Sequence, residues 1–439
     1  METIYNSSKS ALKRNKRPTA NPKMLVLLVT AILLAIPLNY GFSSMAVILF
    51  VVYSLLTAKK EDFTINTSLM LPVALFLLMA VSLTWSIDFK STLKALSKEI
   101  SLFIIPIVFC FNRLWQKQLN DILRFFSLGM FCYGIFYFAR AALAYFSTGD
   151  SSVFFYHSLV TDDVNAIYAS AFFSVAFFYY LSRPQKKLFD YIGAAFIFFL
   201  LFLLSSKNIL LIDILLIIVY FLFFSGVSKK AKWGSVIAFC LFIAAMGYNS
   251  KIRARIAEEF AVQETPSESN PVPVDKVTIH DAWNKETFTQ NDYFSGTALR
   301  VYQIRIFTEM LQEDPIFFTG YGLNASYVKV NEKGLEHNIY KGTEDEPGYH
   351  TYNFHNQYVE VFADLGVFGV LIVILMMFFN IKNGISNKDF VHIAFAIVMI
   401  ALFLTESFLW RQRGVIFFTV LYCLFNKGLY SNAMEKEKK

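Results

Sequence analysis

The chain has 439 residues, of which 56% are hydrophobic and only 17% charged, and its formal net charge is +7. Because soluble domains usually carry about a quarter of their residues as charged side chains, this composition excludes an ordinary soluble protein. The basic residues lie in connections between apolar runs rather than in one patch, so no nucleic-acid partner is expected.

Apolar runs of roughly 17–25 residues, long enough to cross a bilayer as helices, recur along the chain. The sequence therefore predicts an all-α polytopic membrane protein with about twelve transmembrane helices. These spans are expected near residues 24–40, 42–58, 67–85, 96–112, 120–146, 163–181, 188–204, 208–226, 233–249, 356–379, 389–406 and 414–426.

Lysine and arginine cluster in alternate connections, and the loop over residues 148–163 has neither. By the positive-inside rule, both termini are expected in the cytoplasm and one large loop between spans 9 and 10 on the extracytoplasmic side. The predicted organisation is a basic cytoplasmic tail (1–23), nine spans (24–249), the large loop (250–355), three spans (356–426) and a cytoplasmic tail (427–439).

A set of basic residues departs from this rule because they lie at the expected outer ends of spans. Each one alone is compatible with snorkelling to lipid phosphates. Together, facing one compartment, they are typical of the rim of an anion site. They are Lys90, Lys94, Lys98, Arg140, Lys207, Arg411 and Arg413.

Residues 295–313 of the large loop have the apolar period of a helix. Pro315 ends this helix, and Gly320 and Gly322 permit a tight turn after it. Arg300 on the helix can present a planar fork of donors to a phosphate group, or it can belong to an ordinary solvated face.

His355 directly precedes the apolar run that begins near residue 356. A histidine there can take a proton from an incoming hydroxyl, or it can simply bind backbone or water at the membrane surface. Glu406, Arg411 and Arg413 lie between the last two spans, either as part of a cationic site or as a tight ion-paired hairpin. The sequence has no metal-ligand or nucleotide-binding motif, so neither a metal nor a cofactor is expected.

These residues form a pattern that resembles the O-antigen ligase and O-antigen polymerase superfamily of bacterial membrane glycosyltransferases. The pattern comprises Arg300, Pro315, Gly320, Gly322, His355, Asn356, Tyr358, Gly366 and Gly369. Trp85-Ser86 is similar to the family's W-S segment, and Ser206-Lys207 to its S-R hairpin. The lysine in the second motif keeps the charge but removes bidentate geometry.

The resemblance implies a GT-C-like helical fold in the bacterial inner membrane, with the active site on the periplasmic face. It implies transfer, with inversion and without a metal, of a glycan from undecaprenyl diphosphate to a sugar hydroxyl of the lipid A core. We expect His355 and Arg300 to be catalytic. We expect substrate contacts from Lys207, Arg411, Arg413, Arg140, Asn356 and Tyr358, and structural roles for Pro315, Gly320, Gly322, Gly366, Gly369 and Glu406.

Three alternatives remain at this point. A polymerase of O-antigen or exopolysaccharide and a protein O-oligosaccharyltransferase would use the same donor and differ only in the acceptor. A transporter of lipid-linked glycans is a different class of protein, for which inverted repeats and broken mid-membrane helices would be evidence; the sequence shows neither.

Overall fold

The computed structural model describes residues 20–204, 206–226, 275–344 and 346–428, with single positions at 228, 230, 233, 234 and 237. Outside the described residues lie positions 1–19 of the expected tail 1–23, positions 429–439 of the expected tail 427–439, most of the expected span 233–249, and positions 250–274 of the expected loop 250–355.

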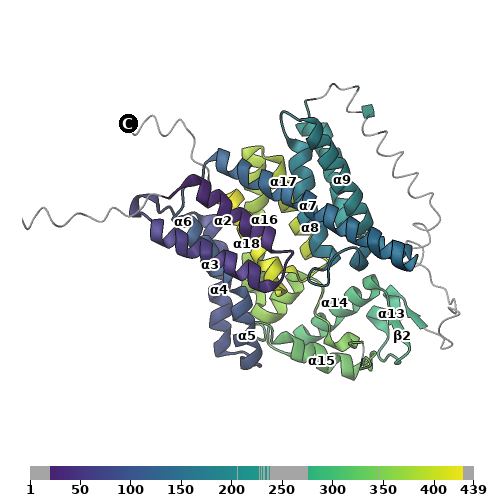
Figure 1. Cartoon of the computed structure of the whole chain (residues 1–439). Coiled ribbons are helices and arrows are strands. Elements are labelled where there is room, and N and C mark those ends of the chain that lie inside the picture. Colours follow the sequence, from purple (N-terminus) through teal and green to yellow (C-terminus); the bar gives the residue numbers. More distant parts are fainter. Residues whose placement is uncertain are drawn as a thin grey trace, which may run out of the picture.

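The described residues are mostly helical (Figure 1). The first half contains α2 (Pro22–Ala35), α3 (Tyr40–Thr57), α4 (Thr67–Val81), α5 (Phe89–Glu99), α6 (Ser101–Cys110), α7 (Gln116–Thr148), α8 (Ala166–Ser182), α9 (Leu188–Leu204) and α10 (Lys207–Val219). The second half contains α13 (Ile279–Asn284), α14 (Gly296–Glu313), α15 (Ser326–Glu336), α16 (Gln357–Asn387), α17 (Phe390–Phe403) and α18 (Gln412–Asn426).

Among the described residues, five helical segments are long and apolar enough to cross a membrane: α3, α4 with its extension to Thr84, α7, α10 with its extension to Phe224, and α16. The shorter apolar helices are α2, α8, α9 and α17. This is consistent with an all-α membrane protein. The count of about twelve spans and the extracytoplasmic location of the large loop stay predictions.

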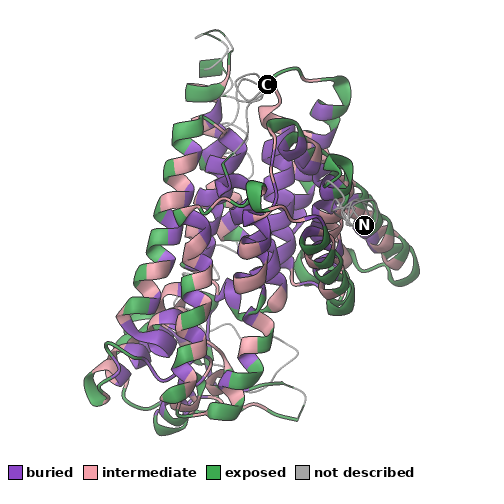
Figure 2. Cartoon of the chain, turned by 90° about the vertical axis from the view of Figure 1, so that its left-hand side faces the viewer, coloured by how far each residue is buried: buried purple, intermediate pink, exposed green. Residues whose placement is uncertain are grey.

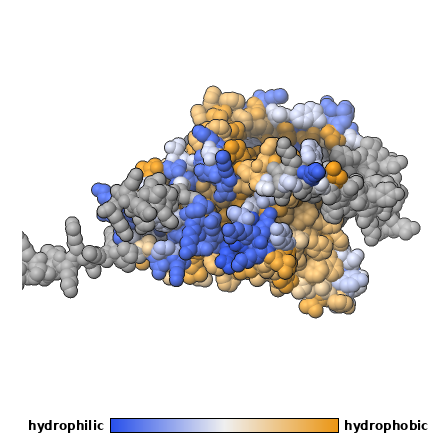
Figure 3. All heavy atoms as spheres, turned by 90° about the horizontal axis from the view of Figure 1, so that it is seen from above, coloured by the Kyte–Doolittle hydropathy of each residue, from blue (hydrophilic) through white to orange (hydrophobic). Residues whose placement is uncertain are grey.

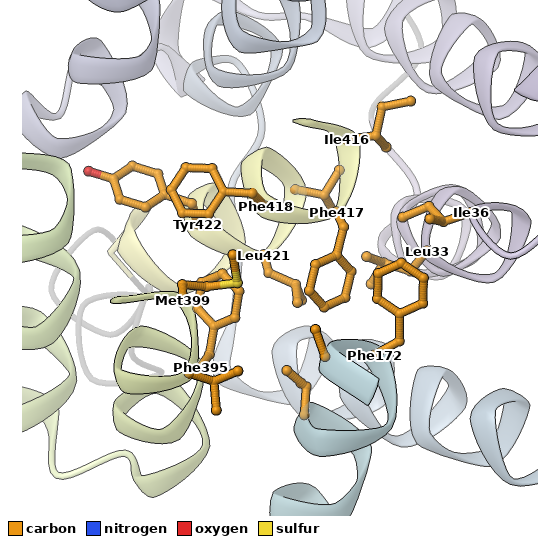
Figure 4. Close-up of a cluster of buried hydrophobic side chains, with 14 of the residues drawn as sticks. Leu33, Ile36, Phe172, Phe395, Met399, Ile416, Phe417, Phe418, Leu421 and Tyr422 are labelled. Carbon is orange, nitrogen blue, oxygen red and sulfur yellow. The ribbon is translucent and has the colours of Figure 1, made fainter. Parts of the chain in front are cut away.

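The core of the helical part is organised around α18. Every residue of this helix from Arg413 to Asn426 is buried. Figure 4 shows its aromatic and aliphatic side chains packed against residues of other helices, among them Leu33 of α2, Phe172 of α8 and Phe395 of α17. In Figure 2 the buried residues lie along the inner faces of the helices and the exposed ones along the outer faces.

The end of the molecule seen in Figure 3 differs in polarity from the flanks. Figure 3 shows hydrophilic residues gathered on the end seen from above and hydrophobic residues along the flanks. A hydrophilic end beside hydrophobic flanks is the pattern of a helical protein whose flanks contact lipid.

The described part of the large loop, residues 275–355, forms a smaller packing unit with its own core, at the end of the molecule where Figure 1 labels α13, α14 and α15. The strands β1 (Asp275–Val277) and β2 (Asp292–Phe294) pair in parallel beside these helices. The helix predicted over residues 295–313 is α14, and the Ser295 side chain caps it by accepting from the Ala298 amide.

A joint made of backbone hydrogen bonds fixes this unit to α16, whose helical geometry is interrupted at Gly366 (φ 67°, ψ −166°). The amides of Tyr321 and Gly322 donate to the carbonyls of Ala363 and Asp364, at 2.9 and 2.8 Å. At this joint the two backbone segments lie closer together than a side chain between them would allow. A Cβ on Gly366 would lie 2.3 Å from the carbonyl carbon of Phe318.

Two other glycines of the predicted motif, Gly320 and Gly322, lie at the same joint, whereas Gly369 lies further along α16, where a Cβ would meet Leu365 and Val361 of the same helix. A Cβ on Gly320 (φ +62°) would lie 2.3 Å from the carbonyl carbon of Asp364, and one on Gly322 (φ +102°) would lie 2.5 Å from Ser86 Cβ. The segment containing Trp85 also docks here, because the indole Nε1 donates to the carbonyl of Thr319 at 3.0 Å.

We predict that Gly366→Ala lowers thermal stability in detergent by more than Gly149→Ala. Both positions have positive φ, which costs an alanine on the order of 1–3 kcal/mol, but a Cβ on Gly149 meets nothing within 4 Å. The additional loss at Gly366 combines its glycine-only backbone conformation (φ 67°, ψ −166°) with the clash against backbone at the joint. Equal melting temperatures for the two variants would contradict this account of the joint.

Candidate active site

The Glu406 carboxylate joins Arg300 and His355. Nη2 of Arg300 lies 3.1 Å from Glu406 Oε1, and Nδ1 of His355 lies 3.4 Å from Glu406 Oε2. The three residues come from α14, from the segment before α16 and from the connection after α17. Tertiary folding thus brings a guanidinium, an imidazole and a carboxylate from three distant segments to one place.

The Arg300 guanidinium is held in a fixed orientation. Its Nε donates to the carbonyl of Thr405 at 3.0 Å, and its Nη1 donates to the carbonyl of Gly296 at 2.9 Å. A guanidinium has more N–H groups than these contacts and Glu406 require, and 31% of the side chain is exposed. Arg300 therefore keeps donor capacity for an anionic ligand.

His355 lies at a sharp turn in the chain. Its φ of 45° is in the left-handed region, which non-glycine residues adopt rarely and which often marks functional sites. The Asn353 side chain accepts from the His355 amide at 3.3 Å. The imidazole is 31% exposed, so a ligand can reach it while Nδ1 faces Glu406.

Asn356 and Tyr358 make contacts within the protein. The Asn356 side chain caps α16 by accepting from the amides of Tyr358 and Val359, and its Nδ2 donates to the carbonyl of Leu404 at 3.2 Å. The Tyr358 ring packs edge-on against Phe403. These contacts hold the start of α16 against the end of α17, and so hold His355 near Glu406. A direct substrate contact by either residue stays a prediction.

Lys207 begins α10, close to the Arg300 site. The next residue, Asn208, donates from Nδ2 to the Thr405 hydroxyl at 2.8 Å and to the carbonyl of Ala401 at 3.0 Å. Since the carbonyl of Thr405 also accepts from Arg300, the exposed Lys207 lies on an element that contacts the same connection as Arg300.

Arg411 is exposed at the start of α18, and its side chain has no hydrogen bond or ion pair to any residue that the structure describes. Its charge acts on His157, which lies in the loop before α8. Burial, and then the charge of Arg411, lower the pKa of His157 below its ordinary value. Arg411 is therefore an exposed cation at the edge of the site.

Arg140 and Arg413 contact other parts of the protein rather than Glu406: Arg140 contacts the loop before α8, and Arg413 contacts both this loop and the start of α3. Arg140 donates to the carbonyls of Ser158 and Val160. The buried Arg413 lies 3.6 Å from Asp163, and its guanidinium carbon is 4.1 Å from the centre of the Tyr40 ring. Its Nη2 also donates to the carbonyl of Leu38 at 2.7 Å. Arg140 thus holds this loop, and Arg413 joins it to the connection between α2 and α3; their contact with substrate stays a prediction.

The same loop contributes two residues that the sequence did not single out. Tyr156 has a φ of 53°, and its ring lies 4.0 Å from the ring of His157. Burial raises the pKa of the Tyr156 phenol, and the Glu406 carboxylate raises it further while Arg300 opposes this. Tyr156 therefore lies within electrostatic reach of the Arg300–Glu406 pair. The signal available in sequence was a Tyr-His pair in an outer loop without lysine or arginine.

A small cavity lies beside this site, behind η7 (Phe408–Trp410). Its volume is about 30 Å³, which suits a water molecule but not a sugar. Glu99, Glu360 and Asp364 line it, and Glu360 accepts from the Ser407 hydroxyl at 2.9 Å. Within the described residues no group of three or more His, Cys, Asp or Glu could hold a metal ion; the expected metal independence stays a prediction.

Residues 192–374 match the family model described as O-antigen ligase. The match includes Arg300, His355 and the glycine joint, whereas Glu406 and Arg411 lie beyond it. No curated protein matches the chain.

We predict that Arg300→Gln and Glu406→Gln destabilise the protein non-additively, with a coupling energy on the order of 0.5–3 kcal/mol. The Glu406 side chain is only 13% exposed, so Arg300→Gln leaves a poorly solvated carboxylate, whereas Glu406→Gln leaves a guanidinium that is 31% exposed and still bound by two carbonyls. A double-mutant cycle, read by reversible chemical unfolding in mixed micelles, measures this coupling.

The matched control is the surface pair Lys329–Glu332, whose side chains are 34% and 58% exposed. Exposed pairs of this kind contribute at most about 1 kcal/mol. A cycle at Arg300 and Glu406 that is additive, or that equals the control, would show that the bridge is not a structural unit.

Proposed function

We propose that this chain, whose residues 192–374 match the O-antigen ligase family, transfers a glycan from undecaprenyl diphosphate to a sugar hydroxyl of the lipid A core. The observation that supports the proposal is the Glu406 carboxylate between Arg300 and His355. It pairs a candidate base with a candidate phosphate-binding cation. The proposed location is the bacterial inner membrane, with both termini cytoplasmic and this site on the periplasmic face.

His355 serves as the general base in this proposal. When Nδ1 carries the proton and donates to Glu406, Nε2 has a free lone pair that can accept a proton from the acceptor hydroxyl. A carboxylate that orients an imidazole in this way also stabilises the imidazolium that forms. Such a base contributes roughly 10²–10⁴ in rate.

The reaction is a single displacement at the anomeric carbon. The acceptor oxygen forms a bond to this carbon while the bond from the carbon to the diphosphate oxygen breaks, which inverts the configuration. The hydroxyl proton goes to His355, and the bonding electrons leave with undecaprenyl diphosphate.

Arg300 stabilises the charge that develops on the departing diphosphate. Its guanidinium is already oriented by Thr405 and Gly296, and preorganised donors lose little energy to rearrangement during the reaction. Lys207 and Arg411, at the start of α10 and α18, supply further positive charge. These cations take the role that a divalent metal has in many phosphate-transfer sites.

We expect His355→Ala to lower kcat by roughly 10²–10⁴, while His280→Ala keeps wild-type activity. His280 lies in the same loop unit with a side chain that is 82% exposed, so its loss tests for a general effect of removing an imidazole. The measurement is glycan transfer by purified protein with a defined undecaprenyl-diphosphate glycan, in the presence of EDTA. Wild-type rates for His355→Ala would remove the base from the mechanism.

The same assay tests the metal and the acceptor. Activity that disappears in EDTA and returns with a divalent ion would contradict the metal-free mechanism. Lipid A core, repeat-unit glycan and an acceptor protein are offered in competition, and the proposal expects product on the lipid A core. Product mainly on the repeat unit would identify a polymerase, and product on the protein an oligosaccharyltransferase.

A further inference from the structure

Helix α5 carries three lysines in one row. Lys90, Lys94 and Lys98 follow each other at intervals of four residues, so they lie on one helix face with about 6 Å of rise between neighbours. This row, called here the α5 lysine row, is not used by the mechanism proposed above. Figure 1 shows that α5 reaches the same end of the molecule as α14 and α15.

The helix that carries the row is fixed to the protein through another face. Thr92 is buried and donates from its hydroxyl to the carbonyl of Leu323 at 2.7 Å. The hydroxyl of Ser91 donates to the carbonyl of Asn324 at 3.2 Å. These contacts attach α5 to the turn that follows the glycine joint, and they leave the lysine face directed away from the protein interior.

Two of the lysines have no partner. Lys90 and Lys94 are exposed, and neither ammonium group makes a hydrogen bond or ion pair within the part of the chain that the structure describes. The neighbouring carboxylate of Asp88 is engaged by the amide of Ser91 at 3.0 Å and by the hydroxyl of Tyr327 at 2.7 Å. Asp88 lies within electrostatic reach of Lys90, but neither Lys90 nor Lys94 is held in an ion pair by any residue that the structure describes, so both ammonium groups can bind an anion.

The last lysine connects the row to the active site. The Lys98 ammonium lies 5.1 Å from the centre of the Trp410 ring, and Trp410 directly precedes Arg411 in the chain. The indole of Trp410 donates to the Asn324 side chain at 2.7 Å. An anionic group bound on the row would thus lie beside the same short connection, residues 404–411, that holds Glu406.

The surface beside the row is apolar. Phe89 and Leu93 are 56% and 53% exposed, and they lie on the helix face adjoining Lys90 and Lys94. A phosphate headgroup above acyl chains matches this combination, because the lysine stems and apolar side chains can contact the chains while the ammonium groups bind phosphate. A soluble anion would match only the charges.

We propose that the α5 lysine row docks the phosphate-bearing headgroup of the lipid acceptor. This inference rests on the proposed function, and it assigns the acceptor's phosphates to α5 while the donor's diphosphate is bound by Arg300 and Lys207 on α14 and α10. Each lipid then reaches the site along a different element, and the acceptor hydroxyl approaches His355 from the α5 side.

The test uses the double variant Lys90→Gln, Lys94→Gln in the full-length protein, reconstituted in zwitterionic proteoliposomes. Two lysines near a phosphorylated lipid surface predict a rise of roughly tenfold or more in KM for the phosphorylated acceptor lipid. kcat and the KM for the donor should not change. With an enzymatically dephosphorylated acceptor, wild type and variant should have the same KM. The matched control removes two exposed lysines elsewhere, Lys117→Gln and Lys382→Gln.

A second measurement does not depend on turnover. Binding of the fluorescently labelled, phosphorylated acceptor lipid to the protein in nanodiscs should weaken by a similar factor in the double variant and stay unchanged in the control. If wild type binds this lipid and the variant does not, but wild type transfers no glycan, the proposed function fails while the docking surface stands.

Three results would overturn the docking proposal. The first is unchanged acceptor binding and KM in the double variant. The second is a rise in the donor's KM instead, which would make the row part of the donor site. The third is an equal effect on phosphorylated and dephosphorylated acceptors, which would show a general contribution to lipid binding.

Discussion

The close backbone approach between the turn at Gly320–Gly322 and the interrupted helix at Gly366 determines the position of the loop unit. The amide–carbonyl contacts at this joint tie residues 321–322 to residues 363–364, and buried backbone groups must be paired in this way to avoid a large desolvation cost. With the joint in place, α14 lies at one fixed position relative to the start of α16. Arg300 on the first element and His355 beside the second then both reach Glu406. The site therefore depends on Gly320, Gly322 and Gly366, although none of these residues takes part in the proposed reaction.

A single carboxylate serves two partners at this site. The Glu406 side chain is 13% exposed, and its two oxygens face different residues, so it balances the Arg300 charge and contacts the His355 ring at the same time. The cost of desolvating a carboxylate is offset by such charge-assisted contacts. The contacts among Arg300, His355 and Glu406 involve only groups of the protein. The remaining guanidinium donors and one edge of the imidazole are exposed, so a ligand can still bind there.

The basic residues at the predicted outer ends of spans separate into three groups with different surroundings. Arg140 and Arg413 bind carbonyls and a carboxylate of the protein and so hold the loop before α8. Lys207 and Arg411 are exposed at the starts of two helices near Glu406. The α5 lysine row lies beside exposed apolar side chains on a separate element. Basic residues that look alike in the sequence therefore have different surroundings in the structure. The first group makes contacts inside the protein, whereas Lys207, Arg411, Lys90 and Lys94 are exposed.

Several features followed from sequence alone because they depend on local composition and spacing. The apolar runs indicated helices suited to a membrane, the spacing over residues 295–313 indicated α14, and the glycines marked places where the chain turns or approaches itself closely. The residue types at Arg300, His355 and Glu406 also suggested their chemistry. Hydropathy, however, measures only how well a segment suits the membrane by itself. It predicted one span over residues 96–112, whereas the structure has two helices there, α5 and α6, which meet at Ile100.

Tertiary structure decided which of these residues meet. Nothing in the spacing of Arg300 and Glu406 indicates a contact across 106 positions, and Tyr156 has no motif around it that would connect it with either. Such contacts depend on how α14, α16 and α17 pack and on the backbone joint at Gly366. Packing involves the whole chain at once, whereas periodicity and motif spacing report on a few turns of it.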